Sequence, residues 1–81
     1  MDNFVTIKTE FIKLQQAMKL AGVVDQGSDA KLIIQDGVVM VNDEVCTMRG
    51  KKLYAGDIVR VNGEVIGRNE DVVFTIRDEI K

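Results

Sequence analysis

Several residue types are missing or scarce in this sequence, and their absence excludes whole classes of function. The chain has no histidine and one cysteine, so zinc sites and Ser/His or Cys/His catalysis have no side chains to use. Cys46 alone cannot form an internal disulfide, which is typical of a reducing compartment. No apolar run approaches the ~20 residues that span a bilayer, so no membrane partner is expected.

The residues that remain also argue against a metabolic enzyme. The seven glycines are scattered and form no phosphate-cradling loop. Adjacent acids occur at Asp43–Glu44 and Glu70–Asp71, and we interpret these as solvated charges on turns. We therefore expect a non-catalytic protein without a metal, a cofactor or a small-molecule substrate. The start "MDNFVTIKTEF" lacks the basic residues and the apolar stretch of a targeting peptide, which predicts a cytoplasmic protein.

The overall composition is that of a small folded protein. The 81 residues are 46% hydrophobic and 30% charged, which is ordinary for one globular domain and unlike a disordered segment. No linker or low-complexity stretch divides the sequence, so we expect a single domain over residues 1–81.

Two segments carry apolar residues at helical spacing. Leu14 and Met18 lie four residues apart within "KLQQAMKLAG", which predicts a helix over about residues 13–21. The segment "GSDAKLIIQDG" has one apolar face and ends at Gly37, which predicts a second helix over residues 28–36. Both helices are expected to pack against a sheet.

Alternating, β-prone residues predict the strands of that sheet. Residues 4–8 and 72–76 are expected as the first and last strands. Between them, strand-like residues flank Asn42-Asp43 and Asn62-Gly63. Asn-Gly is the stronger signal for a tight hairpin because both residues tolerate positive φ, and Asn-Asp is a weaker version of it. The order of strand, two helices and antiparallel strands predicts an α+β domain.

The predicted core consists of the apolar residues that recur on the inner faces of these elements. We expect burial of Leu14, Ala17, Met18, Ala30, Ile33, Val41, Leu53 and Ile58. The aromatic residues Phe4, Phe11 and Phe74 also lie in apolar patterns and are assigned to the core. Tyr54 is then the one aromatic residue near a basic segment, where it can pack under the loop.

That basic segment is "TMRGKKLY", residues 47–54. The chain as a whole is acidic, with 13 Asp and Glu against 11 Lys and Arg, yet Arg49, Lys51 and Lys52 lie within four positions. Residues 61–81 hold three cations and five acids, so the positive charge is concentrated elsewhere. Read from the sequence alone, the segment is either a solubilising loop or a phosphate-binding one.

A resemblance to a known family bears on that choice. The run "KLQQAMKLAG…GSDAKLIIQDGVVMVNDEV…GKKLYAGDIVRV" resembles the S-four RNA-binding domain, named after a protein of the small ribosomal subunit, over about residues 12–61. The matching positions are Leu14, Ala30, Ile33-Ile34, Gly37, Val41-Asn42 and Gly56-Asp57. The resemblance implies an alpha-L motif, in which two short helices pack on a small, mostly antiparallel sheet, here with flanking N- and C-terminal strands.

The resemblance also implies where RNA binds. In this family the second helix and the adjoining strand–loop region form the RNA-facing surface. The residues placed there, or at the commonly basic start of the first helix, are Lys13, Lys31, Arg49, Lys51 and Lys52. We expect Lys31 and the three loop cations to share one positive surface, where the second helix meets the loop. The chain departs from the family at Gly27, where many members carry Arg.

The expected partner is structured RNA, with ribosomal RNA or a ribosome-assembly particle implied by the family. Because few aromatic residues are expected at the surface, recognition through backbone phosphates and shape is favoured over base stacking. Two alternatives remain open. A sulfur carrier of the ubiquitin-like β-grasp type shares "VN-x-E" and "GD", although this chain ends in "RDEIK" and not in Gly-Gly. A protein-interaction module would instead display an exposed apolar patch.

Overall fold

A five-stranded sheet with two helices on one face forms the framework of the protein. The computed structural model describes residues 3–24 and 27–79. The strand order is β1-β7-β6-β3-β4, and β1 and β7 are parallel while the other pairs are antiparallel. These strands are β1 (Asn3–Ile7), β3 (Val39–Val41), β4 (Glu44–Val45), β6 (Ile58–Val61) and β7 (Val72–Asp78). Strands β2 (Ile12–Lys13) and β5 (Lys52–Leu53) form a separate small ribbon.

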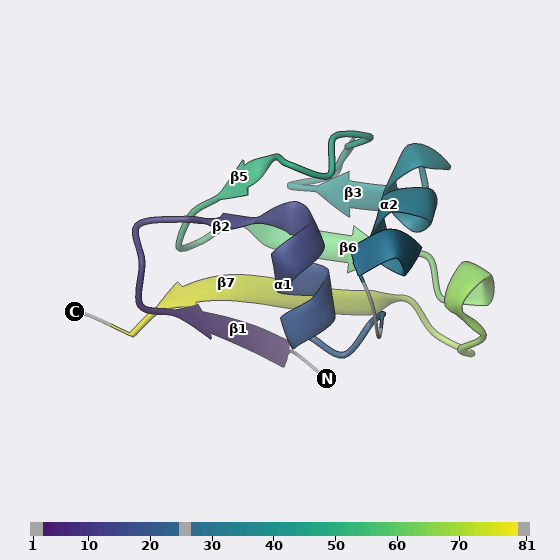
Figure 1. Ribbon diagram of the computed structural model, residues 1–81. Helices are drawn as coiled ribbons and strands as arrows, with labels where there is room; N and C mark the ends of the chain where they lie inside the picture. Colours follow the sequence, from purple (N-terminus) through teal and green to yellow (C-terminus); the bar gives the residue numbers. More distant parts are fainter. Residues whose placement is uncertain (1–2, 25–26, 80–81) are drawn as a thin grey trace.

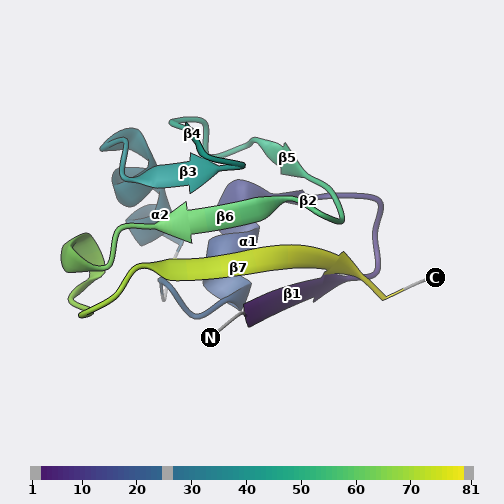
Figure 2. The ribbon, with the colours of Figure 1, turned by 180° about the vertical axis from the view of Figure 1, so that it is seen from behind.

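The two helices lie against the same face of the sheet (Figure 1). Helix α1 spans Leu14–Leu20 and α2 spans Gly27–Gln35, which confirms the helices predicted over 13–21 and 28–36. Seen from behind, the sheet stands in front of both helices, and its second face is left open by the described residues (Figure 2). No helix in the described ranges is long and apolar enough to cross a membrane.

Alternation along the strands builds the core between the sheet and the helices. In β7 the inward residues Val72, Phe74 and Ile76 are buried, while Arg77 is exposed. The helices contribute Leu14, Ala17, Met18, Ala30 and Ile34, each fully buried. This arrangement confirms the predicted α+β class. It also confirms the predicted burial of Val41, Leu53, Phe74 and the named residues of α1, whereas Ile33 is half-buried beside Ile34.

Two residues assigned to the core are exposed, and both predictions were wrong for the same reason. Ile58 is 46% exposed and Phe4 is 51% exposed. The register places Phe4 and Ile58 on either side of Thr75, in one row across three strands. That row lies on the open face, because an antiparallel sheet can leave one side to solvent. The pattern of apolar residues along a strand therefore did not predict which face of the sheet the helices cover.

The tight hairpin forms at Asn42-Asp43 and not at Asn62-Gly63. Asn42 and Asp43 have φ values of 52° and 69°, the left-handed geometry of a two-residue hairpin between β3 and β4. Gly63 has φ of −65° and precedes a 3-10 helix, η1 (Glu64–Ile66), so the hairpin predicted there was wrong. Strands β6 and β7 are antiparallel neighbours, but residues 62–71 connect them as a longer loop.

Candidate nucleic-acid interface

The short ribbon of β2 and β5 sorts its side chains onto two faces. Ile12 is paired with Leu53, and both are buried. Lys13 is paired with Lys52, and both are exposed. Because successive side chains in a strand point to opposite sides, the apolar pair faces the core and the lysine pair faces solvent. The ribbon thus places two cations directly opposite each other on the surface.

The loop that follows β4 is fixed against the start of α1 by backbone hydrogen bonds. The amide of Leu14 donates to the carbonyl of Lys51 at 2.9 Å. The amide of Gln15 donates to the carbonyl of Arg49 at 3.1 Å. These bonds satisfy donors that the first turn of a helix otherwise leaves free. They also hold the backbone of Arg49 and Lys51 next to Lys13, the residue that precedes the helix.

We call the four cations at these adjoining backbone positions, Lys13, Arg49, Lys51 and Lys52, the basic ribbon. All of its members are exposed. The ion pairs found between described residues join Lys8 to Glu79 and Arg60 to Asp71, and neither pair includes a member of the basic ribbon. Like charges directly opposite each other in a sheet are destabilising. The Lys13–Lys52 pair therefore carries a small folding cost and produces a local positive field.

Lys31 lies on a different element from the other candidates. It is an exposed residue of α2, whose buried residues Ala30 and Ile34 lie on the packed side of that helix. No hydrogen bond or ion pair among the described residues joins Lys31 to the basic ribbon. The side chains of residues 25–29, which include the Gly27 position, lie outside the described part. The structure thus brings together four of the five candidates predicted from the sequence.

Two aromatic residues extend the ribbon on its outer face. Phe11 precedes β2 and Tyr54 follows β5. Continuing the register by one residue beyond the Ile12–Leu53 pair therefore places Phe11 opposite Tyr54. Their ring centroids are 6.0 Å apart and the rings are tilted by 52°. The Nζ atom of Lys52 lies 4.7 Å from the Phe11 centroid, which is the geometry of a cation–π contact.

The sequence pattern placed Phe11 in the core, and this pair was therefore not predicted. Phe11 is half-buried and Tyr54 is 45% exposed, so neither is enclosed. A signal was present in the sequence: "FIK" and "KLY" mirror each other around an apolar centre. Antiparallel pairing of such mirrored segments matches aromatic with aromatic and lysine with lysine.

A hydrogen-bond network fixes the turn that carries Tyr54. The Tyr54 amide donates to Oδ2 of Asp57 at 2.8 Å, and Nδ2 of Asn42 donates to Oδ1 of the same carboxylate at 3.1 Å. The amide of Ile58 donates to Oδ1 of Asn42 at 2.9 Å. Asn42 therefore connects the β3–β4 hairpin to the turn beside the basic ribbon.

Replacing Asn42 with alanine should destabilise the protein by about 2 kcal/mol, since it removes both side-chain hydrogen bonds and puts alanine at positive φ. Asp43→Ala is the matched control, because Asp43 shares the positive φ and its side chain makes no hydrogen bond found among the described residues. We expect Asn42→Ala to melt about 4–8 °C below Asp43→Ala in thermal unfolding. Equal melting temperatures would show that the network adds no stability.

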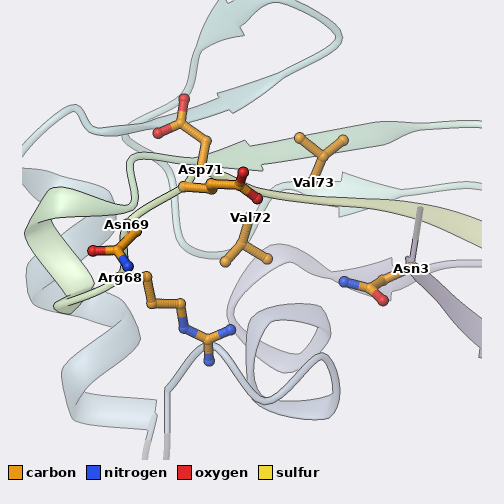
Figure 3. Close-up of a pocket in the computed structure, with 7 residues that line it drawn as sticks. Asn3, Arg68, Asn69, Asp71, Val72 and Val73 are labelled. Carbon is orange, nitrogen blue, oxygen red and sulfur yellow. The ribbon is translucent and has the colours of Figure 1, made fainter. Parts of the chain in front are cut away.

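A polar hollow of about 460 Å³ lies at the other end of the sheet, where β1 and β7 begin (Figure 3). Arg68 and Asp71 line it but point to opposite sides. The Arg68 guanidinium donates to the carbonyl of Gly22 at 3.0 Å. Asp71 accepts from the Gly63 amide at 2.9 Å and forms an ion pair with Arg60. These polar groups hold the 62–71 loop in place, so we assign the hollow a structural role.

Comparison with known proteins agrees with this architecture. Two helices packed on a small mixed sheet, with exposed cations at the start of the first helix, define the class as an α+β domain. Residues 5–67 match the family model of the S4 domain, and the chain belongs to this family. The S-four resemblance noted in the sequence is thereby confirmed.

One relative gives a more particular similarity. Over 63 residues, the chain is 46% identical to the probable ribosome maturation protein RlbA of Bacillus subtilis (strain 168). The aligned region covers 78% of this chain and 89% of that protein.

Proposed function

We propose that this protein is a non-catalytic RNA-binding protein that docks on structured RNA through the basic ribbon. The ligand is ribosomal RNA, either in a ribosome or in a ribosome-assembly particle of the cytoplasm. The observation that supports the proposal is that Lys13, Arg49, Lys51 and Lys52, all exposed, occupy adjoining backbone positions at the start of α1 in a chain whose net charge is −2. The similarity to a ribosome maturation protein supports the choice of ligand.

The acidic total charge is compatible with this role because electrostatic attraction is local. At physiological ionic strength, charges act over a Debye length of about 8 Å, so RNA at the ribbon responds mainly to the nearby cations. Arg49 can bind one phosphate through two parallel hydrogen bonds, whereas the lysines act as point charges. The backbone of the loop is already fixed against α1, so little ordering is needed on binding.

Lys31 extends this surface when the bound RNA also reaches α2. Its contribution is separable, because it lies on another element and makes no described bond to the ribbon. Lys31→Ala should then weaken binding by the amount of one phosphate contact and leave the contacts of the ribbon unchanged.

The experiment that tests the proposal compares two double variants with the same loss of charge. Arg49→Ala with Lys51→Ala removes two cations of the ribbon. Arg60→Ala with Arg77→Ala removes two from the exposed sites of β6 and β7. Fluorescence anisotropy with a labelled ribosomal RNA hairpin at 0.1 M salt should give an affinity loss of about 30-fold for the first variant.

The second variant should bind within about threefold of the wild type, because its cations lie on another surface. An equal loss of RNA affinity in both variants would show that binding depends only on the net charge of the protein. A larger loss for Arg60→Ala with Arg77→Ala would place the RNA on the open face of the sheet. Either result would contradict the proposed docking surface.

A further inference from the structure

The outer face of the β2–β5 ribbon carries aromatic rings as well as cations. Strand alternation puts Phe11 and Tyr54 on the same side as Lys13 and Lys52, opposite the buried Ile12–Leu53 pair. Aromatic rings next to lysines on a solvent-facing ribbon match the two parts of a nucleotide, a flat base and a charged phosphate.

The Tyr54 ring is the more available of the two. It is 45% exposed, whereas Phe11 is half-buried and has the Lys52 ammonium over its ring at 4.7 Å. Phe11 supports Tyr54 from the side at a centroid distance of 6.0 Å. An open hollow of about 930 Å³ borders Phe11 and is also lined by Thr9, Ile12, Gln16, Lys19 and Leu20. The space beside Phe11 is therefore open, and the exposure of Tyr54 leaves its own ring accessible to a flat group.

The backbone under Tyr54 is fixed before any ligand arrives. The Tyr54 amide donates to Oδ2 of Asp57 at 2.8 Å. The Tyr54 carbonyl accepts from the Asp57 amide at 3.0 Å. The adjacent β5 is paired with β2. A ring carried on a fixed backbone requires little ordering of the chain on stacking, which favours its use as a binding platform.

We propose that an unpaired base of the bound RNA stacks on Tyr54, with Phe11 as its support, while the basic ribbon binds the phosphates on either side of that base. This inference rests on the proposed RNA-binding function and adds the kind of RNA that is preferred. Bases inside a continuous helix present no free ring face, so only a bulged, looped or terminal base can make the contact. Because every base has such a face, the preference is for unpaired structure more than for a sequence.

The test uses two RNA hairpins that differ only by one bulged nucleotide, 2-aminopurine, whose fluorescence reports stacking. Wild-type protein should bind the bulged hairpin about tenfold more tightly than the fully paired one, within the range expected for one base–aromatic stack. Tyr54→Ala should abolish this preference and the fluorescence change, yet bind the paired hairpin as the wild type does. Tyr54→Phe keeps the ring and should retain both.

Phe4→Ala provides a matched control. Phe4 is 51% exposed and has the Arg77 guanidinium 4.6 Å from its ring, but it lies on the open face of the sheet. Its replacement should leave the preference for the bulged hairpin unchanged. Equal wild-type affinity for both hairpins, or a preference that survives Tyr54→Ala, would overturn the stacking proposal while the proposed function stands. Wild-type protein that binds neither hairpin would overturn both.

Discussion

Replacing Gly63 with valine is expected to destabilise the protein by about 3 kcal/mol or more, the largest effect on stability that we predict for a single substitution. A Cβ atom at this position would meet the backbone carbonyl of Glu70. No rotamer change relieves a contact with backbone. The shift needed would disturb the bond from the Gly63 amide to Asp71 and the bond from the Arg68 amide to the Gly63 carbonyl.

Thermal unfolding of three glycine variants separates the possible causes. Gly67 has φ of 73° and open space around it, so Gly67→Ala should cost about 1 kcal/mol from backbone strain alone. Gly50 has neither a positive φ nor a neighbour within 4 Å, so Gly50→Ala should be close to neutral. Gly63→Val should melt well below both. A melting temperature like that of Gly67→Ala would show that the backbone contact is not decisive.

Replacing all of Lys13, Arg49, Lys51 and Lys52 with alanine should produce the largest loss of RNA affinity, about 1000-fold at 0.1 M salt. This estimate takes each cation as one phosphate contact. The same variant should fold about as stably as the wild type, because the removal of the Lys13–Lys52 repulsion offsets the loss of the Lys52–Phe11 cation–π contact. Affinity measured by anisotropy should therefore fall while stability measured by urea unfolding stays nearly constant.

A variant that lost both affinity and stability would contradict this expectation. It would indicate that the lysines and Arg49 hold the loop against α1 through their side chains. The described hydrogen bonds between the loop and α1 use backbone atoms alone, at Lys51 and Arg49. Alanine keeps those atoms, so the docking of the loop should survive.

The helices and the fold class were predictable because their signals are local. Leu14 and Met18, or Ala30 and Ile34, recur every fourth residue, and the glycines at positions 22 and 37 end the helical patterns. The basic loop was visible as three cations in four positions. Its attachment to the start of α1 was not, because the bonds involve backbone atoms that every residue type possesses.

The open face of the sheet was not predictable from single strands. A strand pattern shows that two faces differ, but which face is covered depends on where the helices pack. Ile58 and Phe4 were therefore placed in the core, whereas both lie on the uncovered side. The same limit applies to Phe11 and Tyr54, since each strand of their ribbon has only two residues and shows no period of its own.

The turns were predicted wrongly because the prediction used the turn propensities of the residues, whereas tertiary contacts decide where the tight turn forms. Asn62-Gly63 has the stronger hairpin sequence, yet Gly63 is needed for its lack of a side chain next to Glu70 and not for positive φ. Asn42-Asp43 forms the tight turn with positive φ at both residues. There the Asn42 side chain contributes bonds to Asp57 and Ile58 that favour this position.

The salt dependence of RNA binding tests the central claim most directly, because it counts the phosphates that the protein neutralises. With the four cations of the basic ribbon engaged, log K should fall with log salt at a slope of about −3, so affinity drops about 60-fold between 50 and 200 mM salt. Arg49→Ala with Lys51→Ala should reduce the slope to about −1.5 and the drop to about eightfold. Arg60→Ala with Arg77→Ala should keep the wild-type slope. A ribbon variant that binds structured RNA with the wild-type affinity and slope would contradict the account.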